Sequence, residues 1–300
     1  MPIITITGDL ASGKSLVAKR ICSLLNADYF STGQIQREIA TKYGMTTLEL
    51  NKFSETHPEI DQEIDNRVKM LANDERQRIV DSRMAWHFLP DSFKVFLSTN
   101  IVCAAERVIA DTERSNEPVY ADRNDAMLKL QERKRSENKR YLELYDADCS
   151  CLSNFDLVVD TTYSVPEDTI KVIISQFDEW QQGHVVERFW YSPRSILPLR
   201  PLVLAGQSRQ GNEKPAIQVV VSGGNLYAYS SHEGLAVALR NGQAYTPVKV
   251  IAYDDERLPD GVTVDQYLEG FTGSSVMKEW EQEFGFEYLA VSGRFSERQL

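Results

Sequence analysis

The sequence contains few cysteines and no long apolar run. Its four cysteines are too few for a disulfide framework, and only Cys149 and Cys151 lie close together, with no histidine nearby. We therefore expect reduced thiols rather than a zinc site. No hydrophobic stretch approaches the roughly 20 residues that a membrane helix needs, and the chain opens on an apolar, β-branched segment rather than a signal peptide. These features predict a cytoplasmic protein without a membrane anchor.

Positive charge is also scarce, because 33 Lys and Arg face 44 Asp and Glu, which gives a net charge of −11. Broad nucleic-acid affinity depends on basic residues that neutralise phosphates, so the composition argues against it. A local basic groove stays open as an alternative, since five basic residues lie between positions 133 and 140. The length of 300 residues predicts two domains.

The most informative motif that is present lies at residues 8–15, where G-D-L-A-S-G-K-S matches the P-loop pattern. It follows an apolar segment at 3–7 and precedes helical spacing at 16–25, which is the strand–loop–helix setting of a phosphate-binding loop. Lys14 is expected to reach the β- and γ-phosphates, and the Ser15 hydroxyl to ligate Mg²⁺. We therefore predict ATP and Mg²⁺ as cofactors, bound by Gly8, Asp9, Leu10, Ala11, Ser12, Gly13, Lys14, Ser15 and Leu16.

Strand and helix patterns alternate along the first part of the chain, which predicts an α/β domain over 1–182, with a parallel sheet flanked by helices. Residues 181–184 have the composition of a linker. Beyond it, apolar segments at 217–221 and 226–229 enclose a Gly-Gly-Asn turn and predict a β-hairpin. A smaller α+β domain is therefore expected over 184–300.

Several motifs in order make residues 1 to about 180 similar to the P-loop nucleotide kinases, most closely the archaeal-type cytidylate kinases. They lie at 30–38 (F-S-T-G-Q-I-Q-R-E), 56–65 (T-H-P-E-I-D-Q-E-I-D), 139–145 and 155–161. The resemblance implies a P-loop kinase. It also implies an acceptor pocket formed by Ser31, Gly33, Arg37 and Arg83.

The same resemblance implies a mobile lid that carries Arg133, Arg140 and, less directly, Arg114. Guanidinium groups in a closed site would stabilise the charge that develops on the transferring phosphoryl group. Asp81 ends a predicted strand beside the acceptor pocket, where it would hold Mg²⁺ through water or serve as a general base. A base would help a hydroxyl acceptor, whereas a phosphate acceptor is already an anion. The predicted catalytic residues are therefore Lys14, Asp81, Arg133 and Arg140.

Residues 224–250 are similar to the ParB-like nuclease-fold domains. His232 matches the histidine of their G-H-x-R-like turn, but Ser231 replaces the glycine and Gly234 follows where arginine is usual. That departure weakens the expectation of nucleotide hydrolysis or CTP binding by this domain. An unrelated accessory domain that serves dimerisation is the alternative.

Three functions are compatible with these features. The one favoured by the sequence is a kinase of the phage 5-hydroxymethyluracil DNA kinase type, acting in the host cytoplasm on a flipped modified pyrimidine in DNA. The second is a cytidylate or deoxycytidylate kinase that acts on a free pyrimidine nucleotide. The third is a nucleotide-gated regulatory protein that binds DNA. His57 and His87 are expected to pack rather than to catalyse.

Overall fold

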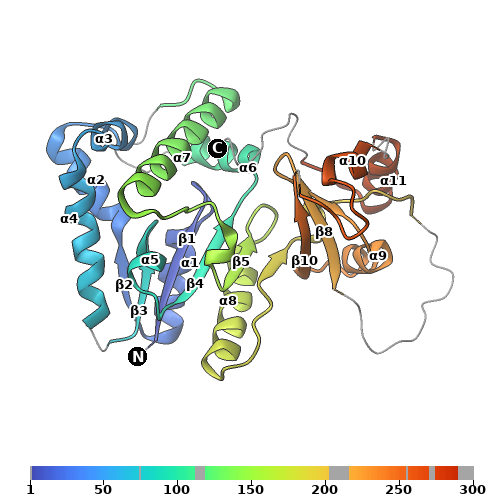
Figure 1. Cartoon of the computed structure of the whole chain (residues 1–300), viewed down its shortest axis with the longest axis horizontal. Helices are drawn as coiled ribbons and strands as arrows, with labels where there is room; N and C mark the ends of the chain where they lie inside the picture. Colours follow the sequence, from blue (N-terminus) through green and yellow to red (C-terminus); the bar gives the residue numbers. More distant parts are fainter. Residues whose placement is uncertain are drawn as a thin grey trace. The chain divides into compact units, whose positions relative to one another are not determined.

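A parallel sheet organises residues 1–188 of the computed structural model (Figure 1). The structure describes residues 2–73, 76–111, 119–202, 216–254, 256–269 and 274–289. Within that part of the chain, five strands run in the order β2-β3-β1-β4-β5, and every neighbouring pair is parallel. They are β1 (Ile3–Gly8), β2 (Asp28–Ser31), β3 (Arg78–Asp81), β4 (Phe93–Ser98) and β5 (Leu157–Asp160).

Helices alternate with these strands, because parallel strands have to be joined by crossover connections. Helices α1 and α8 contact each other and pack on the sheet, while α5 contacts β1. The predicted α/β fold with a parallel sheet flanked by helices is thereby confirmed. The helices are α1 (Lys14–Leu25), α2 (Thr32–Tyr43), α3 (Thr47–Ser54), α4 (Pro58–Lys69), α5 (Ala85–Phe88), α6 (Ile101–Ala110), α7 (Arg123–Tyr145) and α8 (Pro166–Gln181), with short 3₁₀ turns at Met70–Asn73 and Leu152–Asn154.

The local sequence explains where several helices begin. Ser31 caps α2 by accepting a hydrogen bond from the backbone N–H of Gln34, and Thr46 with Glu49 forms a capping box at α3. Asp122 caps α7, which then continues for 23 residues. Helix α7 contacts α3 and α6. It is therefore long enough that side chains spaced one turn apart can line the same cleft.

The carboxyl ends of the central strands meet at one edge of the sheet. Register places Ile6 of β1 beside Asp81 of β3, and Gly8 of β1 beside Leu97 of β4. In open parallel sheets ligands bind outside this edge. The P-loop therefore starts close to Asp81, the last residue of the adjacent strand β3.

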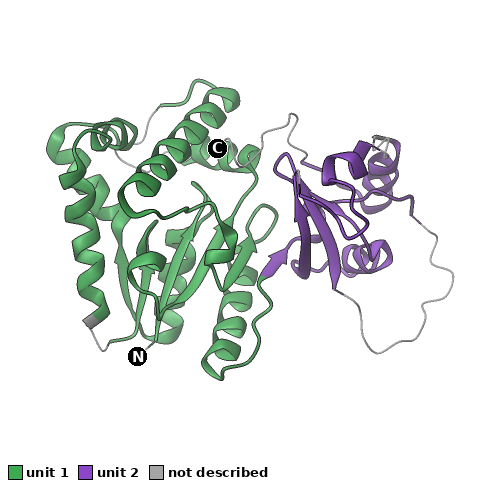
Figure 2. Ribbon diagram, viewed as in Figure 1, with its two compact units in different colours: residues 1–188 green, residues 189–300 purple. Residues whose placement is uncertain are grey.

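Residues 189–300 form the second compact unit (Figure 2). The boundary lies beyond the predicted linker, because the backbone N–H of Val158 donates to the Arg188 carbonyl at 2.7 Å and that of Glu187 donates to Gln176 at 2.9 Å. Within this unit the strand order is β6-β10-β8-β9-β7. Its described elements are β6 (Phe189–Tyr191), a 3₁₀ turn (Pro193–Ser195), β7 (Ile196–Leu197), β8 (Ile217–Ser222), β9 (Asn225–Ala228), α9 (His232–Arg240), β10 (Thr246–Tyr253), α10 (Val264–Glu269) and α11 (Ser274–Phe284).

The predicted hairpin is present in this unit as the antiparallel pair β8–β9, and β10 adds to β8 in parallel. Helix α9 packs on β8, and Trp280 of α11 is almost fully buried in the same core. The unit is thus an α+β structure with its own core. Across the described residues of both units, no helix has the length and apolarity to cross a membrane.

Candidate active site

Two glycines shape the loop between β1 and α1. Gly8 has φ +148°, and a Cβ built on it would lie 2.2 Å from the carbonyl oxygen of Leu97. Gly13 has φ +83° and caps the N-terminus of α1 in the left-handed region. The loop can therefore turn tightly against β4 and deliver its amides to the start of a helix, where the backbone dipoles favour an anion.

The Lys14 ammonium is held by the loop that precedes it. Its Nζ donates to the carbonyl of Gly8 at 3.0 Å and to that of Asp9 at 2.5 Å. Burial, together with the positive charge of Arg83, lowers the pKa of Lys14 to about 7. A phosphate anion brought to the loop would favour the protonated ammonium again, because opposite charge raises the pKa of a lysine.

Ser15, Asp81 and Tyr29 form a hydrogen-bonded group at the first turn of α1. The Ser15 hydroxyl donates to Asp81 Oδ2 at 2.6 Å, and the Tyr29 hydroxyl donates to the same oxygen at 3.1 Å. Asp81 is 6% exposed. Hydroxyl and carboxylate oxygens are ligands of the kind that Mg²⁺ prefers, directly or through water, so the donor set fits this ion.

The loop forms one wall of a cleft that also reaches α2, α4 and α7. Arg37 on α2 faces this cleft together with Gly33, and the described residues offer its guanidinium no ion-pair partner. A cation in that state suits an anionic ligand. The cleft is lined by Leu10, Ala11, Gly13, Lys14, Ser15, Thr32, Gly33, Gln36, Arg37, Asp61, Ile64, Asp81, Ser82, Arg83, Arg133, Glu137 and Tyr141.

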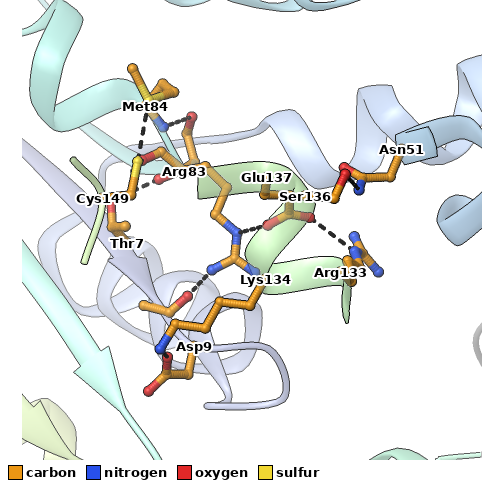
Figure 3. Close-up of polar contacts among 12 residues, drawn as sticks. Thr7, Asp9, Asn51, Arg83, Met84, Arg133, Lys134, Ser136, Glu137 and Cys149 are labelled. Atoms are coloured by element: carbon orange, nitrogen blue, oxygen red, sulfur yellow. Dashed lines mark hydrogen bonds and ion pairs between the residues drawn. The ribbon is translucent and has the colours of Figure 1, made fainter. Parts of the chain in front are cut away.

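Two arginines of this cleft share one carboxylate (Figure 3). Arg83 Nε lies 2.9 Å from Glu137 Oε2, and Arg133 Nε lies 2.9 Å from Glu137 Oε1. Arg83 also donates to the carbonyl of Gly8. Burial alone would raise the pKa of Glu137, but the charges of Arg83 and Arg133 outweigh it and lower the pKa to about 2. Glu137 is therefore an anion at neutral pH.

A further residue of α7 reaches the P-loop from the other direction. Lys134 Nζ lies 3.2 Å from Asp9 Oδ1, and Asp9 Oδ2 accepts from the backbone N–H of Thr99 at 3.0 Å; the Lys134 and Asp9 side chains are drawn in Figure 3. Asp9 thus joins the loop both to α7 and to the segment after β4. Its side chain acts as a tether here, in addition to the predicted contact of its backbone with phosphate.

Arg140 is not brought to this cleft with the other predicted residues. It is 4% exposed, its Nε lies 2.5 Å from Asp61 Oδ2, and its terminal nitrogens donate to Asn51 at 3.0 Å. The guanidinium therefore joins α7 to α3 and α4 from inside the domain. Arg114, the third residue predicted for the lid, lies outside the described residues.

Not all residues predicted for the acceptor pocket line the cleft either. Gly33, Arg37 and Arg83 line the cleft, whereas Ser31 is buried as the N-cap of α2. His57 stacks on Phe53, with ring centroids 3.6 Å apart. Ser31 therefore helps to position α2, the helix that carries Gly33 and Arg37 to the cleft.

A second cleft opens on the other side of the P-loop and shares Ala11, Gly13 and Ser15 with the first. Arg107 of α6 borders it and donates to the carbonyl of Ala11 at 3.1 Å and to the carbonyl of Thr161. Ala11 has φ +60°, a conformation that is unusual for a residue with a side chain. Arg107 thus supports a strained position of the loop. The remaining lining residues are Ser12, Leu16, Val17, Val108, Asp111, Ser164, Pro166 and Thr169.

Sequence reasoning missed three residues of this site. Glu137 lies one turn after Arg133, so the i, i+4 spacing of opposite charges was a usable signal. No local pattern marked Tyr29 or Arg107, because their partners lie 52 and 96 positions away in the chain. These residues can be assigned to the site only from the fold, which brings β2, β3 and the P-loop together.

His232 has a structural environment within the second unit. Its Nε2 accepts a hydrogen bond from the backbone N–H of Leu199 at 3.1 Å, and its ring meets Trp280 edge-on. Burial, with the positive charge of Arg200, lowers its pKa to about 4. The imidazole is therefore neutral at physiological pH and fixes the chain entry to α9.

Comparison with known proteins gives a family for the first unit. Residues 3–163 match the model of the Cytidylate kinase-like family. A cytidylate kinase from Sulfurisphaera tokodaii is 38% identical over 173 residues, covering 57% of this chain and 92% of that protein. A cytidylate kinase from Thermoplasma volcanium is 34% identical over 197 residues, covering 64% and 97%. Among solved structures, a shikimate kinase from Acinetobacter baumannii in complex with shikimate is 17% identical, covers 60% of this chain and 95% of that one, and has a TM-score of 0.41.

Proposed function

We propose that this chain, which belongs to the Cytidylate kinase-like family through residues 3–163, phosphorylates a free pyrimidine nucleoside monophosphate of the cytidylate type. That the chain is an ATP-dependent kinase, with Mg²⁺ as its metal, follows from the family and its relatives. The acceptor is our proposal. One observation carries it: Arg37, which has no ion-pair partner among the described residues, lies in the same cleft as the P-loop, in a chain whose relatives are cytidylate kinases.

The two clefts on either side of the P-loop divide the substrates between them. We assign the nucleoside of ATP to the cleft beside Arg107, since a triphosphate that starts there reaches the loop amides and Lys14. The acceptor phosphate lies on Arg37 in the opposite cleft. One acceptor oxygen then forms a bond to the γ-phosphorus as the bond to the β,γ-bridging oxygen breaks, leaving ADP and a nucleoside diphosphate.

The chain supplies mostly charge and position to this step. Lys14 and the loop amides bind the phosphates of the donor, while Arg83 and Arg133 stabilise the charge on the transferring group. Ser15 and Asp81 would hold Mg²⁺, which neutralises phosphate charge when it is bound. For Arg140 we propose a positioning role, because its ion pair with Asp61 lies at the wall of the acceptor cleft.

The hypothesis of a DNA-base kinase, favoured by the sequence, is now the weaker one. It rested on the ParB-like resemblance of the second unit, with Asp81 as a possible general base for a hydroxyl acceptor, and Asp81 Oδ2 already accepts from Ser15 and Tyr29. That arrangement suits a metal anchor, and an anionic phosphate acceptor needs no base. The ParB-like resemblance of residues 224–250 stays a prediction, and the relatives named above cover the kinase unit rather than this segment.

Transfer of label from γ-³²P-ATP tests the acceptor directly. CMP, dCMP, ordinary DNA and DNA containing 5-hydroxymethyluracil are offered in parallel to the full chain, and we expect label on CMP or dCMP. The Arg37→Gln variant should raise the KM for the monophosphate while leaving the affinity for MgADP unchanged, because Arg37 faces only the acceptor cleft. Label on the modified DNA alone would refute the proposal, and Lys14→Ala should abolish transfer to any acceptor.

A further inference from the structure

A single buried carboxylate sets the spacing of two arginines at the P-loop cleft. Glu137 is 4% exposed and meets Arg83 through one oxygen and Arg133 through the other, each at 2.9 Å (Figure 3). Arg83 follows β3, whereas Arg133 lies one turn before Glu137 on α7. The carboxylate therefore joins the edge of the sheet to α7 through two guanidiniums.

Such an arrangement needs a reason, because burying a carboxylate is unfavourable unless its charge is paired. Both arginines bind Glu137 through Nε, and their terminal nitrogens contact the P-loop, α3 and α2. Arg83 donates from Nη1 to the Gly8 carbonyl, and Arg133 donates to Thr47 at 3.3 Å and Gln36 at 3.4 Å. Without the carboxylate, two like charges would lie in the same cleft without their shared counter-ion.

We propose that Glu137 is a positioning residue for phosphoryl transfer, which holds Arg83 and Arg133 at a fixed separation so that both guanidiniums meet the transferring group. The proposal rests on the kinase activity described above and adds a residue to it. Glu137 does not touch the phosphates itself. Its negative charge even opposes their binding, because Glu137 lines the same cleft as the P-loop lysine and like charges repel.

A positioning role and a merely structural role therefore predict different effects of a Glu137 substitution on MgADP affinity and on turnover. Replacing Glu137 by Gln removes a negative charge from the cleft, so MgADP should bind more tightly, by roughly tenfold for a separation on the order of 10 Å at an effective dielectric of about 20. At the same time the two arginines lose their common anchor, and kcat should fall by about 10²-fold, as misplacement of catalytic groups by about 1 Å can cause. Structural damage alone would weaken binding and turnover together.

The experiment compares Glu137→Gln, Glu137→Asp and Glu132→Gln in the full chain. Asp keeps the charge but cannot span both arginines, so its affinity for MgADP should stay near wild type while kcat falls. Glu132 provides the matched control, since it lies on the same helix in an exposed ion pair with Lys52 at 2.7 Å. Affinity is measured calorimetrically with MgADP, turnover with ATP and CMP, and folding by thermal unfolding.

The expected pattern is lower kcat in both Glu137 variants, tighter MgADP binding only in Glu137→Gln, and neither change in Glu132→Gln. A kcat within twofold of wild type in both Glu137 variants would overturn the proposal, and so would weaker MgADP binding in Glu137→Gln. If Glu137→Gln does not fold, Glu137→Asp decides through its kcat at unchanged affinity. A wild-type chain inactive on CMP would refute the acceptor assignment, while the MgADP affinities would still test the charge of Glu137.

Discussion

Replacing Gly8 with alanine tests whether the P-loop depends on the close approach of its backbone to β4. The added Cβ would lie 2.2 Å from the carbonyl oxygen, 2.7 Å from the nitrogen and 2.8 Å from the carbonyl carbon of Leu97. None of these atoms can move easily, because β4 is hydrogen-bonded to both β1 and β5. The φ of +148° at Gly8 adds a conformation that alanine rarely adopts.

The magnitude follows from these two effects. Backbone strain of this kind costs about 1–3 kcal/mol, and an overpacked contact adds about 1–3 kcal/mol. For a unit of this size each kcal/mol lowers Tm by roughly 2–4 °C, so Gly8→Ala should lower the Tm of the kinase unit by roughly 5–20 °C. Affinity for MgADP should fall as well, since the loop amides must shift.

Gly13→Ala provides the comparison that isolates the steric contact. Gly13 also has a positive φ, +83°, but nothing lies within 4 Å of its built Cβ. This variant should therefore lose only about 1–2 kcal/mol from the left-handed conformation. Calorimetric scans of the full chain with and without MgADP measure both, because ligand raises the Tm of the unit that binds it. Equal shifts in the two variants, or a Gly8→Ala shift below 2 °C, would refute the reasoning.

Three further changes test other parts of the site. Asp81→Asn should raise the Mg²⁺ concentration needed for half-maximal activity by about 10–100-fold, because Asp81 orients Ser15; an unchanged Mg²⁺ titration would exclude that role. Because the pKa of Lys14 is lowered to about 7, MgATP binding at pH 8 should be coupled to the uptake of a proton. Calorimetry in buffers of different ionisation enthalpy detects this uptake, and the Lys14→Met variant should not show it. Burial raises the pKa of Asp65 to about 6, so the protonated side chain favours the fold at low pH and this contribution is lost as pH rises from about 4 to 6. The free energy of unfolding of the wild type therefore declines between pH 4 and pH 7, and Asp65→Asn should remove on the order of 2–3 kcal/mol of this decline. Urea unfolding at the two pH values measures it.

Much of the fold could be predicted from sequence because its signals are local. The segment at 3–7, the glycine loop and the helix that follows are adjacent in the chain, and the structure places them as β1, P-loop and α1. The capping residues of α3 and α7 are likewise within a few positions of the N–H groups that they accept from. Patterns of this length survive in the structure because packing reinforces them.

The site was harder to predict because its geometry depends on distant residues. The family resemblance implied a lid whose arginines act together, yet Arg140 lies about two turns beyond Arg133 along α7 and is buried against Asp61, whereas Arg133 lines the cleft. Asp81 was correctly placed beside the loop, but its use depends on Tyr29, which comes from another strand. The resemblance to a family supplied residue roles, and only coordinates distinguished the residues that line the cleft from those that support it.

The length of α7 has a consequence for how the two substrates influence each other. Lys134 binds the P-loop through Asp9, while Arg133 and Glu137 on the same helix line the acceptor cleft. A helix moves nearly as one body, so a donor that displaces Lys134 would also change the free energy of binding of the acceptor. Thermodynamic linkage makes this influence reciprocal. We therefore expect occupancy of one cleft to change the affinity of the other through this helix.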